Sequence, residues 1–133
     1  ARPRWFGLDD ADLQAALVRD GPRLIHWVAR CDDLAAARAA FGADDPGTPL
    51  EAERDTPAGR LRWAITVRPD GRRLCGGALP TLIAWKSAHP VDALPPTGLR
   101  LEALALGALP PAVAARLPPG VSTGRAAALA ARI

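Results

Sequence analysis

One histidine inside an apolar run is the first residue of this 133-residue sequence whose type and setting could support chemistry. His26 is the only polar residue of the segment 24–29. Alternation along a strand would place Leu24, His26 and Val28 on one face. A neutral imidazole in that place is either a core residue that hydrogen-bonds to a neighbour or a metal ligand.

Two tryptophans and an arginine are the candidate ligand-binding residues. Trp63 and Trp85 lie in alternating segments, so each either belongs to the core or stacks on a small molecule in a groove. Arg62 and Lys86 either face that groove and attract an anionic substrate or contact solvent. Glu102 is either a ligand or base, or a solvated residue at a sheet edge. The sequence assigns no catalytic residue.

Composition predicts a soluble, cytoplasmic protein. The net charge is +3, but the arginines are scattered among acidic residues, which argues against a nucleic-acid partner. Nothing resembles a signal peptide, and no apolar run approaches the roughly 20 residues of a membrane span. Cys31 and Cys75 lack the spacing of a metal site and the density of a disulfide scaffold, so we expect reduced thiols.

The elements that position these residues follow from hydrophobic periodicity and capping signals. A strand is predicted over 24–29 and a helix over 34–41, begun by Asp32 or Asp33 and stopped at Gly42. Further predicted elements are helices over 11–18 and 111–117 and strands over 48–54, 61–67, 81–86 and 99–106. Residues 125–133 are compatible with either a strand or a helix.

We expect one domain over residues 1–133, with a lead and short helix over 1–20, a strand-helix-strand unit over 21–90 and a C-terminal strand and helix over 91–133. This order predicts an α+β fold in which the helix covers one face of a curved mixed sheet and the other face lines a groove. Trp5 and Phe6 should anchor the lead on the body. The expected core consists of Leu24, Ile25, Trp27, Val28, Leu34, Phe41, Ile65, Leu82, Ile83 and Leu101.

Two short segments resemble the glyoxalase-like domain proteins of the vicinal oxygen chelate superfamily. Residues 22–29 followed by Asp32-Asp33-Leu34 are similar to the first strand and helix of a βαβββ module, and residues 77–85 followed by His89-Pro90 are similar to a late strand. The resemblance implies that 21–90 is such a module, and that two modules together form a cup. This chain resembles a C-terminal half, so its expected partner is an N-terminal module or, in a homodimer, a second copy of the chain.

The resemblance also implies a small oxygenated molecule as ligand and a divalent metal as cofactor. Many members hold a metal that acts as a Lewis acid, and His26 matches their first-strand histidine ligand. Ala84 stands where a carboxylate ligand would be expected, and alanine cannot bind a metal. Three functions therefore stay open: a metal-assisted lyase, isomerase or dioxygenase, a non-catalytic cup that sequesters a small molecule, and a half-domain that is inactive without its partner.

Overall fold

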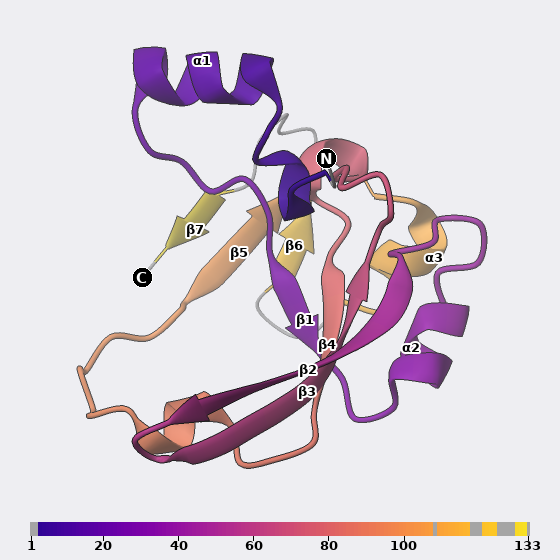
Figure 1. Cartoon of the computed structure of the whole chain (residues 1–133). Coiled ribbons are helices and arrows are strands. Elements are labelled where there is room, and N and C mark those ends of the chain that lie inside the picture. Colours follow the sequence, from indigo (N-terminus) through magenta and orange to yellow (C-terminus); the bar gives the residue numbers. More distant parts are fainter. Residues whose placement is uncertain (1–2, 108, 118–120, 125–129, 133) are drawn as a thin grey trace.

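The main element of the fold is a four-stranded mixed sheet (Figure 1). The computed structural model describes residues 3–107, 109–117, 121–124 and 130–132. The strands of this sheet are β1 (Val28–Arg30), β2 (Thr48–Thr56), β3 (Gly59–Val67) and β4 (Thr81–Trp85), in the order β1-β4-β3-β2. β1 runs parallel to β4, whereas β3 is antiparallel to β4 and β2. With helix α2 (Leu34–Ala39) between β1 and β2, this is the predicted βαβββ arrangement in an α+β fold.

Helix α2 covers one face of this sheet. The Asp33 carboxylate accepts the N–H of Ala36 at 2.9 Å and so caps the helix start. The helix packs on β4, and Arg38 near its end binds the Asp45 carboxylate through two hydrogen bonds of 3.0 and 2.8 Å. The helix and the turn that leads into β2 are thereby held together, and the opposite face of the sheet is left free.

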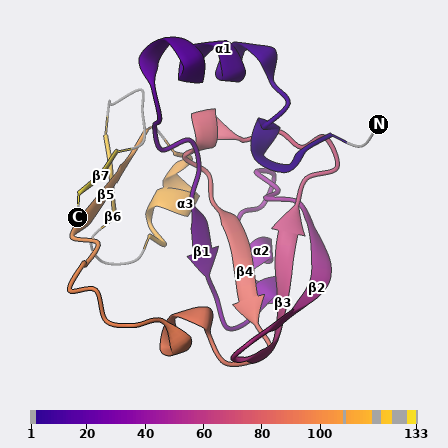
Figure 2. The same ribbon diagram turned by 60° about the vertical axis from the view of Figure 1, so that its left-hand side comes forward.

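The N-terminal lead is anchored as predicted. It contains the short 3-10 helix η1 (Trp5–Gly7), whose Gly7 N–H donates to the Gly71 carbonyl at 2.7 Å. Helix α1 (Ala11–Asp20) follows, capped by Asp10, and stands apart from the sheets (Figure 2). In the described part of the chain, none of the helices is both long and apolar enough to cross a bilayer.

A second sheet, of three short strands, lies on the β1 side of the first (Figure 2). It has the order β6-β5-β7 and consists of β5 (Ala103–Leu106), β6 (Val121–Thr123) and β7 (Ala130–Arg132). Helix α3 (Pro111–Ala114) connects β5 to β6, and two 3-10 helices, η2 (Cys75–Gly77) and η3 (Pro90–Ala93), flank β4. β6 was not predicted, and β7 shows that 130–132 are strand. The rest of 125–133 lies outside the described residues.

The first strand is shorter than predicted, so His26 precedes β1 instead of lying inside it. The first bond between the two parallel segments runs from the Thr81 N–H to the Trp27 carbonyl, at 3.3 Å. Upstream of Thr81, Pro80 has no N–H and η2 turns the chain away. Residues 24–26 therefore have no strand beside them on the β4 side.

Three of the predicted core residues are exposed. Leu24 is 38% exposed because it precedes the ladder, and Val28 is 44% exposed because β1 is an edge strand. Leu101 is 59% exposed, since β5 begins at Ala103 and not at residue 99. Ile65 and Leu82 are buried as predicted, and the other predicted core residues are partly buried.

Candidate functional site

The face of the four-stranded sheet opposite α2 carries both candidate tryptophans. Trp63 of β3 pairs with Trp85 of β4, and Ile65 pairs with Ile83, so all four side chains share this face. They line a groove of about 520 Å³, which we call the aromatic groove. Its lining among the described residues is Trp5, Phe6, Val28, Arg30, Arg54, Leu61, Trp63, Ile65, Ile83, Trp85, His89 and Pro90.

The two indole rings form one aromatic surface. The centroids of Trp63 and Trp85 are 5.5 Å apart with an interplanar angle of 46°. Trp85 also meets the edge of His89, at 5.1 Å and 67°. The Nδ1 atom of His89 accepts the Val91 N–H at 3.1 Å, which holds that ring in place. A planar ligand could therefore stack on a preformed surface.

The charge of the aromatic groove is positive. Arg30 of β1 and Arg54 of β2 line it, and no Asp or Glu is among the lining residues that the structure describes. In the described part of the chain, neither arginine takes part in an ion pair. Sequence reasoning missed both arginines. Alternation in fact signals them, because Arg30 follows Val28 by two residues and Arg54 faces Leu61 in the hairpin register.

Arg62 does not join the two tryptophans. It lies between Leu61 and Trp63 on β3, and successive side chains of a strand point to opposite faces. Its side chain is exposed and faces Glu53 across the hairpin. The structure thus brings Trp63 and Trp85 together and places Arg62 on the other side of the sheet.

The other two charged candidates are engaged in ion pairs. Lys86 pairs with Glu51. Glu102 pairs with Arg132 at 3.1 Å, and both side chains are exposed. Exposed pairs of this kind fit the reading of Lys86 and Glu102 as solvent-facing residues. The cysteines Cys31 and Cys75 are both free thiols, as predicted.

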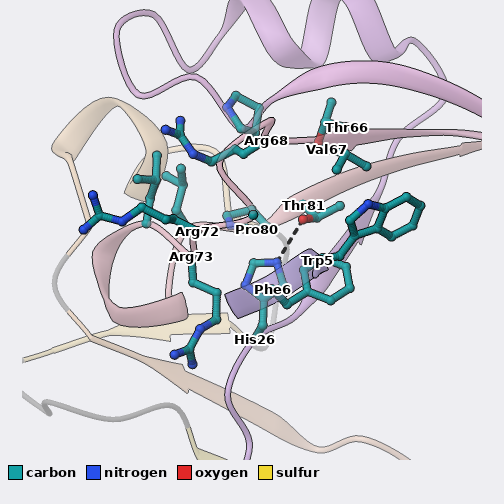
Figure 3. Close-up of a pocket in the computed structure, with 14 residues that line it drawn as sticks. Trp5, Phe6, His26, Thr66, Val67, Arg68, Arg72, Arg73, Pro80 and Thr81 are labelled. Atoms are coloured by element: carbon teal, nitrogen blue, oxygen red, sulfur yellow. Dashed lines mark hydrogen bonds between the residues drawn. The ribbon is translucent and has the colours of Figure 1, made fainter. Parts of the chain in front are cut away.

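His26 lies in a separate small cavity of about 20 Å³, enough for about one water molecule (Figure 3). Its Nδ1 atom is 3.2 Å from the Gly77 carbonyl, and its Nε2 atom is 2.9 Å from the Thr81 hydroxyl. Because a carbonyl can only accept, Nδ1 carries the hydrogen, and in the neutral ring Nε2 accepts from Thr81. Phe6 stacks on the imidazole at 5.0 Å and 28°.

Burial lowers the pKa of His26 below its ordinary value of 6.5. The Gly77 carbonyl opposes this shift, whereas the positive charge of Arg73 adds to it. The environment therefore favours the neutral imidazole, the form that can act as a core residue or as a metal ligand.

A family model described as glyoxalase-like domain matches residues 1–119. The chain belongs to the glyoxalase-like domain family. This membership confirms the resemblance and places the chain in the vicinal oxygen chelate superfamily. Comparisons with curated proteins and with solved structures found no match.

The donor set around His26 in this glyoxalase-like domain does not fit a metal centre. Both of its ring nitrogens already have hydrogen-bond partners. Among the residues that the structure describes, no three His, Cys, Asp or Glu side chains gather closely enough to hold an ion. An ion at Nε2 would displace the Thr81 hydroxyl and would need ligands from outside these residues. A metal at His26 accordingly stays a prediction from the resemblance.

Proposed function

We propose that this glyoxalase-like domain binds a small, flat molecule with an anionic group in the aromatic groove. The observation that carries this proposal is the pair of Trp63 and Trp85 on a concave face, flanked by Arg30 and Arg54. Indole faces stack on planar ligands, and guanidinium groups pair with carboxylates and related anions. The groove volume of about 520 Å³ lies within the range of about 300 to 1,000 Å³ that is usual for small-molecule sites.

Binding is the role that the lining of the groove supports best. A general acid or base must lie within hydrogen-bond reach of the proton it moves. His89 is the one imidazole among the described lining, and its Nδ1 atom accepts the Val91 N–H. In the neutral ring Nε2 then carries the hydrogen, so this ring can donate a hydrogen bond to a ligand but has no free base. Metal-assisted lyase, isomerase or dioxygenase activity remains the alternative, and it requires ligands from a partner.

Two fluorescent probes test this proposal. Anilinonaphthalene sulfonate carries an anionic group, whereas phenylnaphthylamine has nearly the same ring system without it. We expect both to quench tryptophan emission saturably, and the sulfonate to bind more tightly. Replacing Trp63→Leu should weaken both probes because it removes half of the aromatic surface.

The arginines offer a matched comparison. Arg54→Gln should lower the affinity for the sulfonate about two- to fivefold, which is the contribution expected of a partly exposed charge pair. The affinity for the neutral probe should not change. Arg62→Gln is the control, because Arg62 lies on the same hairpin but on the opposite face. The proposal is wrong if Arg54→Gln and Arg62→Gln change the affinity for the sulfonate equally. It is also wrong if Trp63→Leu binds both probes as the parent protein does, because the probes would then bind elsewhere.

We also propose that a second βαβββ module closes the aromatic groove. β1 pairs only with β4 in the described structure, and edge strands are natural places for a further chain to join. Val28, at this edge, is exposed although it lines the groove. The partner is a second copy of this chain or an N-terminal module, as the family resemblance implies.

A further inference from the structure

A larger pocket lies between the two sheets, separated from the aromatic groove by β1. We call it the inter-sheet pocket, and its volume is about 800 Å³. One wall includes Phe41, just after α2, and Leu82 of β4, whereas the other includes Leu104 of β5 and Val113 of α3. Figure 2 shows α3 and the second sheet beside β1, where this pocket lies.

The walls of the inter-sheet pocket are held by contacts within the chain. The indole N–H of Trp27 donates to the Ala78 carbonyl at 2.8 Å, and its ring packs against the buried cluster of Ala78, Leu104 and Leu106. The thiol of Cys31 donates to the Ile83 carbonyl at 3.6 Å. Because these polar atoms bond within the protein, the surface that they leave to a ligand is apolar.

The inter-sheet pocket differs in chemistry from the aromatic groove. Its apolar lining is mainly alanine, valine and leucine, and its described lining has no pair of neighbouring indoles, so it suits an aliphatic body better than a flat ring. Its charged lining residues are Arg30 and Arg116, with no Asp or Glu among the described lining. Neither arginine has an ion-pair partner among the described residues.

We propose that the inter-sheet pocket is a second ligand site, which binds a small molecule with an aliphatic body and one carboxylate. The body would replace water over the apolar walls, which is favourable in proportion to the apolar surface that it covers. The carboxylate would pair with Arg116, which is exposed in the turn after α3 and can adjust to it. Medium-chain fatty acids belong to this chemical class. Leu104, Val113 and Arg116 line only the inter-sheet pocket, which shares Val28 and Arg30 of β1 with the aromatic groove.

Cys31 provides a reporter inside the pocket. Its pKa is raised by burial and by the charges of Asp32 and Asp33, so it should react slowly but measurably with a thiol reagent. In a Cys75→Ser protein it is the only thiol. We expect saturating decanoate to slow the modification of Cys31 about tenfold or more, corresponding to about 1.4 kcal/mol of protection. Calorimetric titration with decanoate gives the affinity directly.

Four variants locate the bound decanoate. Ala36 and Ala35 are exposed neighbours on α2, but only Ala36 lines the pocket. Ala36→Phe should fill the pocket and reduce decanoate affinity about tenfold or more, whereas Ala35→Phe should leave it unchanged. Arg116→Gln should lower the affinity for decanoate about two- to fivefold without changing the affinity for decanol, which has no charge. Trp63→Leu, which alters the aromatic groove, should not affect either probe.

The same measurements can overturn the proposal. The proposal is wrong if Cys31 reacts equally fast with and without decanoate. It is also wrong if Ala36→Phe and Ala35→Phe bind decanoate with equal affinity. Circular dichroism and thermal unfolding of each variant show whether it is folded. Loss of decanoate binding in Trp63→Leu would assign the probe to the aromatic groove and would equally reject a second site.

Discussion

His26 is held beneath Phe6, with the Gly77 carbonyl on one ring nitrogen and the Thr81 hydroxyl on the other. The cavity excludes most of the water that would stabilise an imidazolium, and the charge of Arg73 acts in the same direction. The ring therefore joins the N-terminal lead to the segment before β4. At the level of single residues, its observed contacts are those of a satisfied interior histidine.

The free energy of unfolding should fall as the pH drops below about 6.5. The pKa of His26 is 6.5 when unfolded and lower when folded, so between these values the unfolded chain binds more protons. The stability present above pH 6.5 is thus lost as the pH falls through the folded pKa. Urea denaturation between about pH 5 and pH 8 should show this slope, and His26→Gln should reduce it.

His89→Gln is the matched control for this titration, because it removes the other histidine of the chain. Comparison of the two variants shows whether the slope belongs to His26. If His26→Gln and the parent showed identical pH dependence, burial of the neutral imidazole would not contribute to stability.

The hairpin of β2 and β3 is the element that carries Arg54 and Trp63 to the aromatic groove, and a glycine lies at or just before the start of each strand. Gly47 precedes β2 with a φ of +117°, and Gly59 begins β3 with a φ of +116°. A Cβ on Gly47 would lie 2.3 Å from the backbone carbon of Val67, whereas one on Gly59 would have no atom within 4 Å. The two positions therefore share a backbone conformation but differ in crowding.

Gly47→Ala should destabilise the protein clearly more than Gly59→Ala. Both changes force an L side chain into the left-handed region, at about 1 to 3 kcal/mol. Only Gly47→Ala also pushes the backbone at the end of β3. Denaturant unfolding measures both losses of free energy. Equal losses would mean that the close approach at Gly47 relaxes without cost.

At the scale of the whole molecule, β1 is the element that the two cavities share. Val28 and Arg30 line both the aromatic groove and the inter-sheet pocket, and the edge of β1 opposite β4 has no described strand beside it. Val28, on this edge strand, is 44% exposed. Apolar groups exposed at an unpaired edge are typical of an interaction surface.

We expect the chain to form a dimer through this edge, with a concentration dependence visible by sedimentation velocity. Val28→Glu should raise the dimer dissociation constant about tenfold or more, because a charge would then be buried without a partner. Val18→Glu is the control, since Val18 is 89% exposed on α1, away from the edge. A monomer at every concentration would remove the second copy as the partner.

Local signals were sufficient to predict much of the fold. Asp33 begins α2 as its capping signal indicates, and alternation over 61–67 correctly put Trp63 and Ile65 on one face. Alternation failed at residues 24–27, because a strand also needs a neighbour and the chain before Thr81 does not provide one. The βαβββ order was therefore predictable, whereas the extent of β1 was not.

The sequence by itself determined the helix starts and the alternating faces of the strands, because these depend on residues that are close in the chain. It also determined the membership in the glyoxalase-like family, through a match over residues 1–119. Tertiary structure alone decided the surroundings of His26, whose partners Gly77 and Thr81 are 51 and 55 residues away. It also decided that Arg54 of β2 joins the groove of the tryptophans, through its register opposite Leu61 of β3. Such contacts depend on strand order and register across the sheet, which no short segment specifies.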